Sequence, residues 1–171
     1  MTQDVIINKV SSSSLITIDL EAYYPTQVQA IFDLKEFLFM GLILKEKDFR
    51  QALKEHHFAQ YKDAVLTITC TADAIIPVWA YMLIAAYAQP YASSIHTSTP
   101  AQSILTQLLA NINAIPTAQY QDQRVVVKGC GDKHIDHAAY VAITTLLRPV
   151  AKSIMYGEPC STVPIYKATQ A

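Results

Sequence analysis

Alternating hydrophobic and polar positions predict β-strands in the first part of the chain. Residues 14–25, SLITIDLEAYYP, alternate in this way and are rich in strand-forming residues, so they predict a first strand that a proline turn closes. A second, short strand is expected at residues 31–34. Residues 47–56 place Phe49 and Leu53 at helical spacing, and their many charges predict a helix with one solvated face.

The second part of the chain repeats itself. The stretch FAQYKDAVLTITC (58–70) aligns with TAQYQDQRVVVKGC (117–130), and AYMLIAAYAQPYASSI (80–95) aligns with AYVAITTLLRPVAKSI (139–154). Each half predicts a strand, a cysteine-bearing turn, an apolar helix and a second strand. Strands joined by a helix pair in parallel through a right-handed crossover. The predicted fold is therefore α/β, with two duplicated βαβ units in a mostly parallel sheet covered by helices, preceded by an N-terminal strand–helix segment.

A single domain is expected over residues 1–171. Within it we expect an N-terminal segment (1–57), a first βαβ repeat (58–98), a linking helix (99–116), a second βαβ repeat (117–160) and a C-terminal tail (161–171). The linking helix should start at Thr99, because threonine followed by Pro100 suits an N-cap and the first helical position.

Composition narrows the classes of partner. Hydrophobic residues make up 51% of the 171 residues, charged residues only 16%, and the net charge is −1. Without a basic field, nucleic acid is not an expected partner. Residues 74–95 carry no formal charge, but Pro77, Gln89 and Pro90 interrupt them, so we predict a buried helix and no membrane partner. The N-terminus does not have the pattern of a secretory signal, which favours a cytoplasmic location.

The three cysteines suggest a metal site. Cys70, Cys130 and Cys160 each follow a predicted strand, and ligands gather at the carboxyl ends of parallel strands. The repeat relates Cys70 to Cys130 by an approximate pseudo-symmetry. Three thiolates would suit zinc or an iron–sulfur cluster. A fourth ligand, or hydrogen bonds to the ligands, could come from carboxylates near the cysteines: Asp73, Asp132 and Glu158.

The neighbours of Cys130 have simpler interpretations. His134 and His137 are expected on the surface, close to the start of a helix. Gly129 and Gly131 are expected to turn the backbone through positive φ.

Two other functions stay open on the residues alone. Cys130 could be the nucleophile of a thiol-dependent enzyme, with Lys128 and the following helix lowering the pKa of its thiol. Alternatively, the chain could be a non-catalytic dimeric scaffold whose cysteines are buried as packing residues. A nucleotide cofactor is not expected, because the sequence contains no P-loop or GxGxxG motif and only four glycines.

Four stretches together resemble one family: KEKDFRQALKEH, CTADAIIPVWAYM, VVVKGCGDK and RPVAKSIMYGEPCSTVPIYK. The chain is similar to the domain of unknown function 2480 family over residues 8–167, although HIDH after Asp132 departs from the family pattern. That pattern falls on three cysteine-centred motifs: Cys70, Ala72, Asp73, Pro77 and Trp79; Lys128, Gly129, Cys130, Gly131, Asp132 and Lys133; and Gly157, Glu158, Pro159, Cys160, Ser161 and Pro164.

The family carries no established activity, so the resemblance implies no reaction. Its members are often encoded near components of sulfur-mobilisation iron–sulfur assembly, which implies iron–sulfur assembly proteins as partners; a homodimer is a second expectation. Together with the cysteines, this predicts a cytoplasmic protein with a three-cysteine metal or iron–sulfur site that is accessory to iron–sulfur or sulfur handling.

Overall fold

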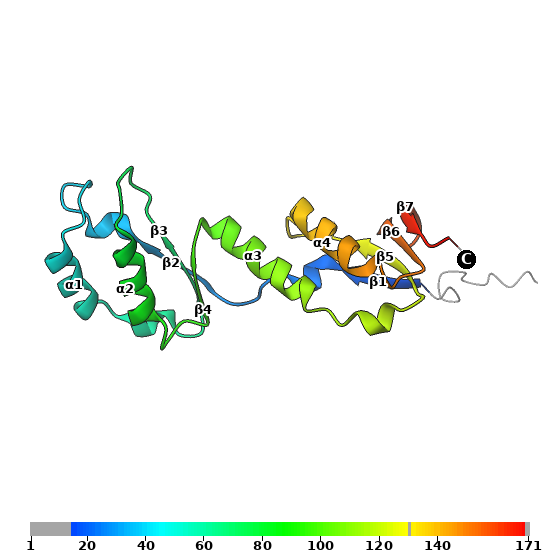
Figure 1. Ribbon diagram of the computed structural model, residues 1–171, viewed down its shortest axis with the longest axis horizontal. Coiled ribbons are helices and arrows are strands. Elements are labelled where there is room, and N and C mark those ends of the chain that lie inside the picture. The colour runs from blue at the N-terminus through cyan, green and yellow to red at the C-terminus, as the bar shows by residue number, and fades with distance from the viewer. Residues whose placement is uncertain (1–14, 130, 170–171) are drawn as a thin grey trace, which may run out of the picture. The chain divides into compact units, whose positions relative to one another are not determined.

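The computed structural model describes residues 15–129 and 131–169, and its chain divides into two compact units (Figure 1). Unit 2 is continuous and consists of Thr26–Ile104. Unit 1 combines the chain before it, up to Pro25, with the chain after it, from Leu105 onward. Strands and helices alternate in both units, so the predicted α/β class is confirmed. Whether the two units behave as the predicted single domain stays a prediction.

Unit 2 holds a parallel sheet of three strands in the order β2-β3-β4. The strands are β2 (Gln29–Asp33), β3 (Val65–Thr69) and β4 (Ser94–Thr97). Helices α1 (Glu46–Glu55) and α2 (Val78–Ala88) share one hydrophobic core with the sheet. Because α2 connects the parallel strands β3 and β4, the first predicted βαβ unit is present.

Unit 1 holds a four-stranded sheet in the order β1-β5-β6-β7. The strands are β1 (Leu15–Asp19), β5 (Arg124–Lys128), β6 (Ser153–Glu158) and β7 (Ser161–Lys167). Helix α4 (His137–Leu147) connects the parallel pair β5 and β6, which forms the second predicted βαβ unit. Residues 161–167, expected as part of a tail, instead form an antiparallel hairpin with β6. Pro164 is tolerated there because β7 is an edge strand.

Helix α3 (Pro100–Asn113) begins where the sequence predicts it. The Thr99 hydroxyl accepts a hydrogen bond from the Gln102 N–H (3.3 Å), and the Gln102 side chain accepts one from the Thr99 N–H (3.2 Å). This reciprocal capping box satisfies two backbone donors of the first turn. The boundary between the two units falls inside this helix.

From the 3-10 helix before β3 onward, the elements of unit 2 recur in unit 1 at a constant numbering offset. The bounds of β3, α2 and their preceding 3-10 helix (Phe58–Tyr61) recur 59 positions later in β5, α4 and the 3-10 helix Thr117–Tyr120. The left-handed residues Asp63 (φ 59°) and Asp122 (φ 56°) are equivalent as well. The first strands are also equivalent, because β1 pairs with β5 in the register in which β2 pairs with β3.

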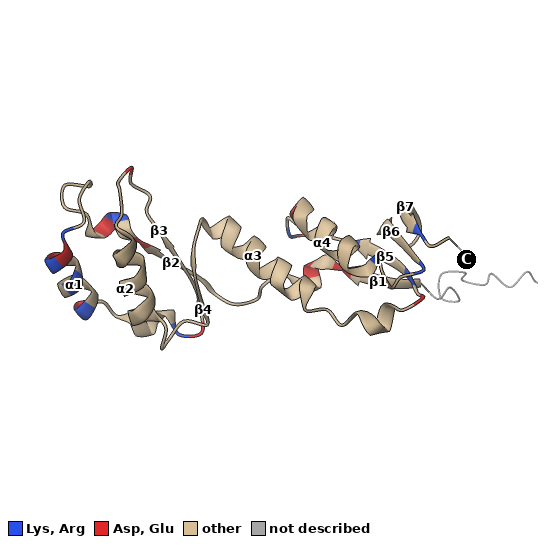
Figure 2. Ribbon diagram, in the orientation of Figure 1, with Lys and Arg blue, Asp and Glu red and all other residues tan. Residues whose placement is uncertain are grey.

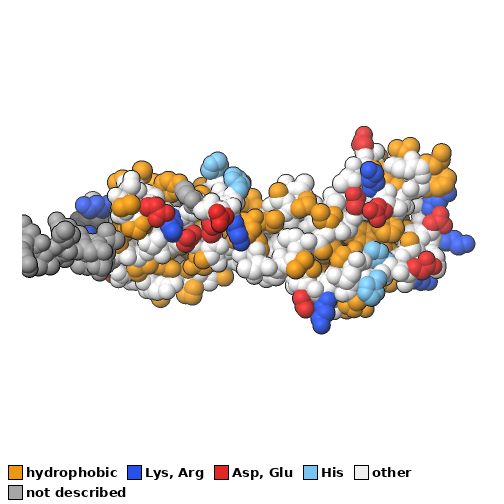
Figure 3. Space-filling model, turned by 180° about the vertical axis from the view of Figure 1, so that it is seen from behind, with side chains coloured by type: hydrophobic (Ala, Val, Ile, Leu, Met, Phe, Trp, Pro, Cys, Tyr) orange, Lys and Arg blue, Asp and Glu red, His pale blue; other side chains and the backbone are white. Residues whose placement is uncertain are grey.

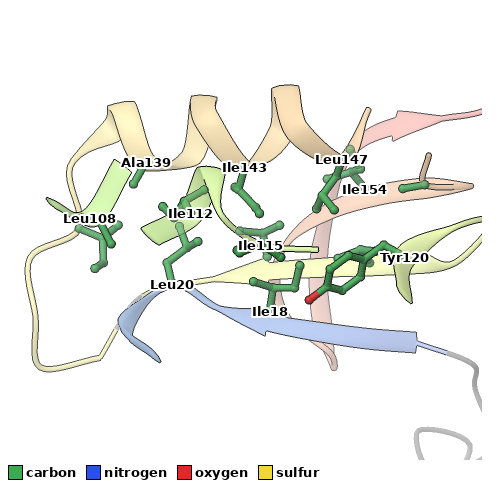
Figure 4. Packing of buried hydrophobic residues seen from close by; sticks show 14 residues of the cluster. Ile18, Leu20, Leu108, Ile112, Ile115, Tyr120, Ala139, Ile143, Leu147 and Ile154 are labelled. Atoms are coloured by element: carbon green, nitrogen blue, oxygen red, sulfur yellow. The ribbon is translucent and has the colours of Figure 1, made fainter. Parts of the chain in front are cut away.

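Each unit has its own core. In unit 1, Ala139, Ile143 and Leu147 point from α4 toward the sheet, and they belong to one core with Ile115, Ile18 and Ile154 (Figure 4). In unit 2, rings such as those of Phe32, Phe49 and Phe58 fill much of the equivalent space. The cores share no residue. Across the described parts of both units, no helix has both the length and the hydropathy needed to span a membrane.

Candidate functional site

Charged side chains converge at the carboxyl edge of the unit 1 sheet. The Lys128 ammonium, at the end of β5, lies 3.2 Å from a carboxylate oxygen of Asp19 on β1 and 3.8 Å from one of Glu158 on β6. The hydrogen bond to Asp19, helped by the charges of Asp19, Glu158 and Glu21, raises the pKa of Lys128 above its ordinary value. Lys128 therefore stays protonated at neutral pH and serves as a fixed cation rather than as a base or nucleophile.

Glu21 ties down the loop that follows β5. Its carboxylate accepts a hydrogen bond from the Lys133 N–H at 3.4 Å. A β-carbon on Gly131 would overlap the Glu21 carboxylate, so a larger residue there would require the Glu21 side chain to move. The Lys133 ammonium lies 4.5 Å from the centre of the Tyr24 ring, a cation–π contact that adds to this anchoring.

Gly129 has a different role from the predicted one. Among the described glycines, those with positive φ are Gly41 and Gly157, so the expectation for Gly129 was wrong. Its carbonyl instead accepts a hydrogen bond from the Tyr140 hydroxyl (3.1 Å), and a β-carbon would lie 2.6 Å from that hydroxyl oxygen. Gly129 allows α4 to approach the end of β5 closely.

The predicted three-cysteine metal site is not supported. The described residues contain no group of three or more histidine, cysteine, aspartate or glutamate side chains that could hold a metal ion. Cys70 follows β3 in the unit 2 sheet, whereas exposed Cys160 lies between β6 and β7 in unit 1. Cys130 lies outside the described residues, and its role as a reactive thiol stays a prediction. The prediction of a shared metal or iron–sulfur site was wrong, because it assumed one sheet where the chain forms two.

The cysteines also do not form equivalent positions. Asp19 of β1 pairs with Lys128, and Asp33 of β2 pairs with Thr69, so Lys128 and Thr69 are equivalent positions. The residues that follow them, Gly129 and Cys70, are then equivalent too. The pseudo-symmetry that seemed to relate Cys70 to Cys130 is therefore out by one residue. Of the two described cysteines, Cys160 is exposed, whereas half-buried Cys70 packs against the unit 2 core.

The remaining predicted residues lie apart from any shared metal site. Asp73 and Asp132 are exposed in the loops after β3 and β5, and Glu158 forms the ion pair with Lys128. His134 and His137 are exposed, as expected, and His137 is the first residue of α4.

In unit 2 the carboxyl edge is organised by Asp33. One oxygen of its carboxylate accepts hydrogen bonds from the N–H groups of Lys35 (2.9 Å) and Thr71 (3.1 Å), and the other accepts one from the Thr71 hydroxyl (2.5 Å). Desolvation acts to raise the pKa of Asp33, but these hydrogen bonds and the Lys35 charge outweigh it and leave the pKa below its ordinary value. Asp33 thereby holds the loop after β3 against the end of β2.

We expect Asp33→Asn to lower the free energy of unfolding by about 1 kcal/mol at neutral pH, because the amide cannot replace all of these hydrogen bonds. A carboxylate with a lowered folded-state pKa stabilises the fold above its unfolded pKa, 3.8, and loses that effect as the pH falls through the folded value. The difference between wild type and variant should therefore shrink below pH 3.8. Urea unfolding across this range measures it. Asp73→Asn in the exposed loop is the control, and a difference that persists at low pH would contradict the assignment.

A pocket opens beside this loop, at the carboxyl ends of β3 and β4. It is open to solvent and has a volume of about 720 Å³. Its wall combines the loop after β3, the first turns of α2 and the connection from β4 to α3. The side chains that line it are Ile68, Thr69, Cys70, Ala72, Ala74, Ile76, Val78, Tyr81, Thr97, Ser98, Thr99 and Gln102. Hydroxyl, thiol, amide and apolar groups are represented, and no charged side chain is among them.

An apolar turn follows β2 at the same edge of the sheet. Residues 39–43 form a tight turn closed by the Phe39–Ile43 bridge, with positive φ at Met40 and Gly41. Phe39, Met40, Leu42 and Ile43 are all exposed, Met40 by 82%. The carboxyl edge of unit 2 thus combines the Asp33 carboxylate with an exposed apolar turn and a pocket lined by neutral side chains, whereas charged side chains pair with one another at the carboxyl edge of unit 1.

Sequence reasoning missed Asp19, Glu21 and Asp33. A signal was available: the Asp-Leu pair at Asp19–Leu20 recurs at Asp33–Leu34, each after an apolar strand. In both cases the aspartate side chain accepts a hydrogen bond from the N–H two residues later and starts a 3-10 helix. This is the local bonding that short acidic side chains favour at helix starts.

Comparison with known proteins gives one match. The model of a family described as protein of unknown function (DUF2480) matches residues 4–168. The chain belongs to this family. None of the curated proteins and none of the solved structures matches the chain. The DUF2480 assignment confirms the resemblance seen in the sequence and brings no activity with it. The expected iron–sulfur assembly partners and cytoplasmic location stay predictions.

Proposed function

We propose that the protein binds a small uncharged molecule in the pocket at the carboxyl edge of the unit 2 sheet. The observation that carries the proposal is the lining of that pocket, about 720 Å³ in volume, by neutral side chains alone. Its size lies within the range of small-molecule sites, and apolar walls with a few polar groups are typical of them. Its position at the ends of parallel strands is the usual one for ligands of α/β folds.

The lining also selects the chemistry of the ligand. Ile76, Val78 and the Tyr81 ring supply an apolar wall, while Thr97 and Ser98 supply hydroxyl groups at the end of β4. A charged ligand would lose water without gaining a counter-charge from the lining. We therefore propose a ligand with a flat or apolar ring face and with hydroxyl or amide groups. Neutral nucleosides and sugars share this chemistry.

The Cys70 thiol provides a direct test because it lines the pocket, whereas Cys160 is exposed on the β6–β7 turn of unit 1. Iodoacetamide labelling of the full chain, resolved by peptide mass spectrometry, gives the alkylation rate of each thiol. We expect adenosine or glucose at about 10 mM to slow alkylation of Cys70 at least threefold and to leave Cys160 unchanged. The two probes distinguish a nucleoside from a sugar, and adenosine monophosphate tests the effect of charge.

Thr97→Val removes one hydroxyl from the pocket at nearly constant shape, and Thr145→Val on α4 is the control. We expect the first variant to weaken protection by about 3- to 10-fold and the second to leave it unchanged. Equal protection of Cys70 and Cys160, stronger protection by adenosine monophosphate than by adenosine, or no protection by any probe would contradict the proposal.

A further inference from the structure

A second pocket lies at the amino edge of the unit 1 sheet, at the opposite end of the strands from Lys128. It is bounded by the first residues of the parallel strands β1, β5 and β6 and by the last residues of the antiparallel strand β7. It is open to solvent, has a volume of about 730 Å³ and shares no lining residue with the pocket in unit 2. We call it the amino-edge pocket, and its lining includes Arg124, Lys152, Ser153, Met155, Pro164 and Lys167.

Three cationic side chains line the amino-edge pocket, and no carboxylate does. Arg124 begins β5, Lys152 precedes β6 and Lys167 ends β7. Within the described residues, no ion pair joins any of the three to an acidic side chain. Asp122, two positions before Arg124, is exposed and lies outside the lining. Figure 2 shows basic residues at this end of the unit 1 sheet, where β7 ends.

The carboxyl edge of the same sheet is the opposite case. There Lys128 lies 3.2 Å from Asp19 and 3.8 Å from Glu158, and Figure 3 shows acidic and basic side chains next to one another on unit 1. With fourteen acidic and thirteen basic residues, the chain is not short of carboxylates. Cations that are grouped without carboxylates repel one another, and an anion that joins them removes this cost.

Unit 2 shows that the fold does not require these cations. At the numbering offset of 59, Arg124 corresponds to Val65 and Lys152 to Ser93, which are both neutral. Lys167 has no counterpart, because the three-stranded sheet of unit 2 has no strand equivalent to β7. The strands are repeated and their cations are not. The packing of the duplicated fold therefore does not explain the basic residues of the amino-edge pocket.

We propose that the amino-edge pocket binds a small organic dianion, either a phosphate ester or a dicarboxylate. Arginine and lysine are the usual partners of both head groups, and arginine binds them through paired N–H donors. Ser153 adds a hydroxyl donor, while Met155 and Pro164 provide an apolar wall for the body of the ligand. The volume of the pocket lies within the range of small-molecule sites. This inference does not depend on the neutral ligand proposed for unit 2.

The charge distribution favours a small anion over a polyanionic surface. Nucleic acid and anionic membranes are bound by basic residues that extend over a surface, usually on a chain or domain of positive net charge. Here the cations line one pocket, and the net charge of the chain is −1. The ligand should therefore fit within the pocket.

Isothermal titration calorimetry of the full chain tests the proposal, with phenyl phosphate and phthalate as the two probes. We expect a dissociation constant of about 0.1–1 mM for at least one of them. The two probes distinguish a phosphate ester from a dicarboxylate. Raising the NaCl concentration from about 20 to about 200 mM should weaken binding at least threefold, because salt screens exposed charges. Benzyl alcohol carries the ring without the charge and should bind at least about 10-fold more weakly.

Variants at the exposed cations locate the site. Arg124→Gln should weaken binding of the dianion at least about 10-fold. Lys152→Ser introduces the residue of the equivalent position in unit 2 and should weaken binding about 3- to 10-fold. Arg50→Gln makes the first change on exposed α1 of unit 2 and should alter the dissociation constant by less than about twofold. Circular dichroism verifies that all three variants fold.

Three results would overturn the proposal. The first is a wild-type chain that binds neither dianion at concentrations up to about 10 mM. The second is binding that benzyl alcohol matches, or that Arg50→Gln weakens as much as Arg124→Gln does. The third is a single-stranded oligothymidylate that binds more tightly than either probe and loses this binding with Arg124→Gln, which would make nucleic acid the ligand of these cations.

Discussion

Replacing Ile84 or Ile143 by alanine is expected to lower the free energy of unfolding of its own unit by about 2–5 kcal/mol. The two isoleucines occupy equivalent places on α2 and α4, and both are fully buried. Each truncation removes buried methyl groups and leaves a cavity that a closely packed core closes only in part. Chemical denaturation monitored by circular dichroism measures the loss.

Tryptophan fluorescence separates the two units. Trp79, the single tryptophan of the chain, packs against Phe49 in unit 2, so its signal reports that unit. Because the two cores share no residue, we expect Ile84→Ala to shift the fluorescence transition and Ile143→Ala to leave it in place. A shift with both variants would show that the units unfold as the single domain that the sequence predicts.

The control is Val141→Ala, because Val141 is 66% exposed on the same helix as Ile143. Its effect should stay within about 0.5 kcal/mol. A loss with Ile143→Ala that is no larger than this would contradict the packing of α4 on the unit 1 sheet.

Gly157→Ala is expected to destabilise unit 1 by about 3 kcal/mol. Gly157 has φ of +121°, a conformation that side chains with a β-carbon rarely adopt, and an added β-carbon would lie 2.5 Å from the Ser161 carbonyl oxygen. That oxygen belongs to the backbone of the β6–β7 hairpin, so relief of the overlap must move the paired strands. Thermal unfolding followed by circular dichroism measures the change.

Gly41→Ala isolates the cost of the overlap. Gly41 also has positive φ, +73°, but a β-carbon there would meet no atom within 4 Å. Its replacement should cost only about 1 kcal/mol, the penalty of a left-handed residue. If both alanine variants cost the same, the contact with Ser161 carries no energy and the hairpin geometry at Gly157 is wrong.

The local elements were predictable because their signals are local. Alternation at β1 and helical spacing at Phe49 and Leu53 depend on near neighbours, and both elements form. The first strand is shorter than the predicted residues 14–25, because Asp19 ends it and starts a 3-10 helix, Leu20–Tyr23. Pairing between distant strands has no such signal. The residues around Leu15 contain no signal for its pairing with Arg124. For that reason the division of the first 57 residues between two sheets was not predicted. Only the repeated Asp-Leu pair points to two equivalent first strands.

The prediction of the site failed at the level of single residues. Lys128 and Glu158 were identified as motif residues, and the structure does bring them together. Their partner Asp19 was missed, since it belongs to a strand expected outside the repeat. Cys70 and Cys130 differ by 60 positions, close to the repeat length of 59, so they seemed to be equivalent residues. That apparent equivalence led to the prediction of a metal site. One residue is decisive at a strand end, because successive side chains point to opposite faces.

In the sequence, unit 2 lies between the two segments of unit 1, and this determines the order in which the units can fold during synthesis. Strand β1 leaves the ribosome first, yet its partner β5 is made about a hundred residues later. Because synthesis adds about 5–20 residues per second, the backbone hydrogen-bonding groups of β1 lack their β5 partners for several seconds. Unit 2 is continuous and finds all its partners in that interval. The nascent chain therefore contains a folded unit 2 and an unpaired β1 at the same time. A pause in translation before residue 124 prolongs this state, in which β1 can pair with a wrong strand.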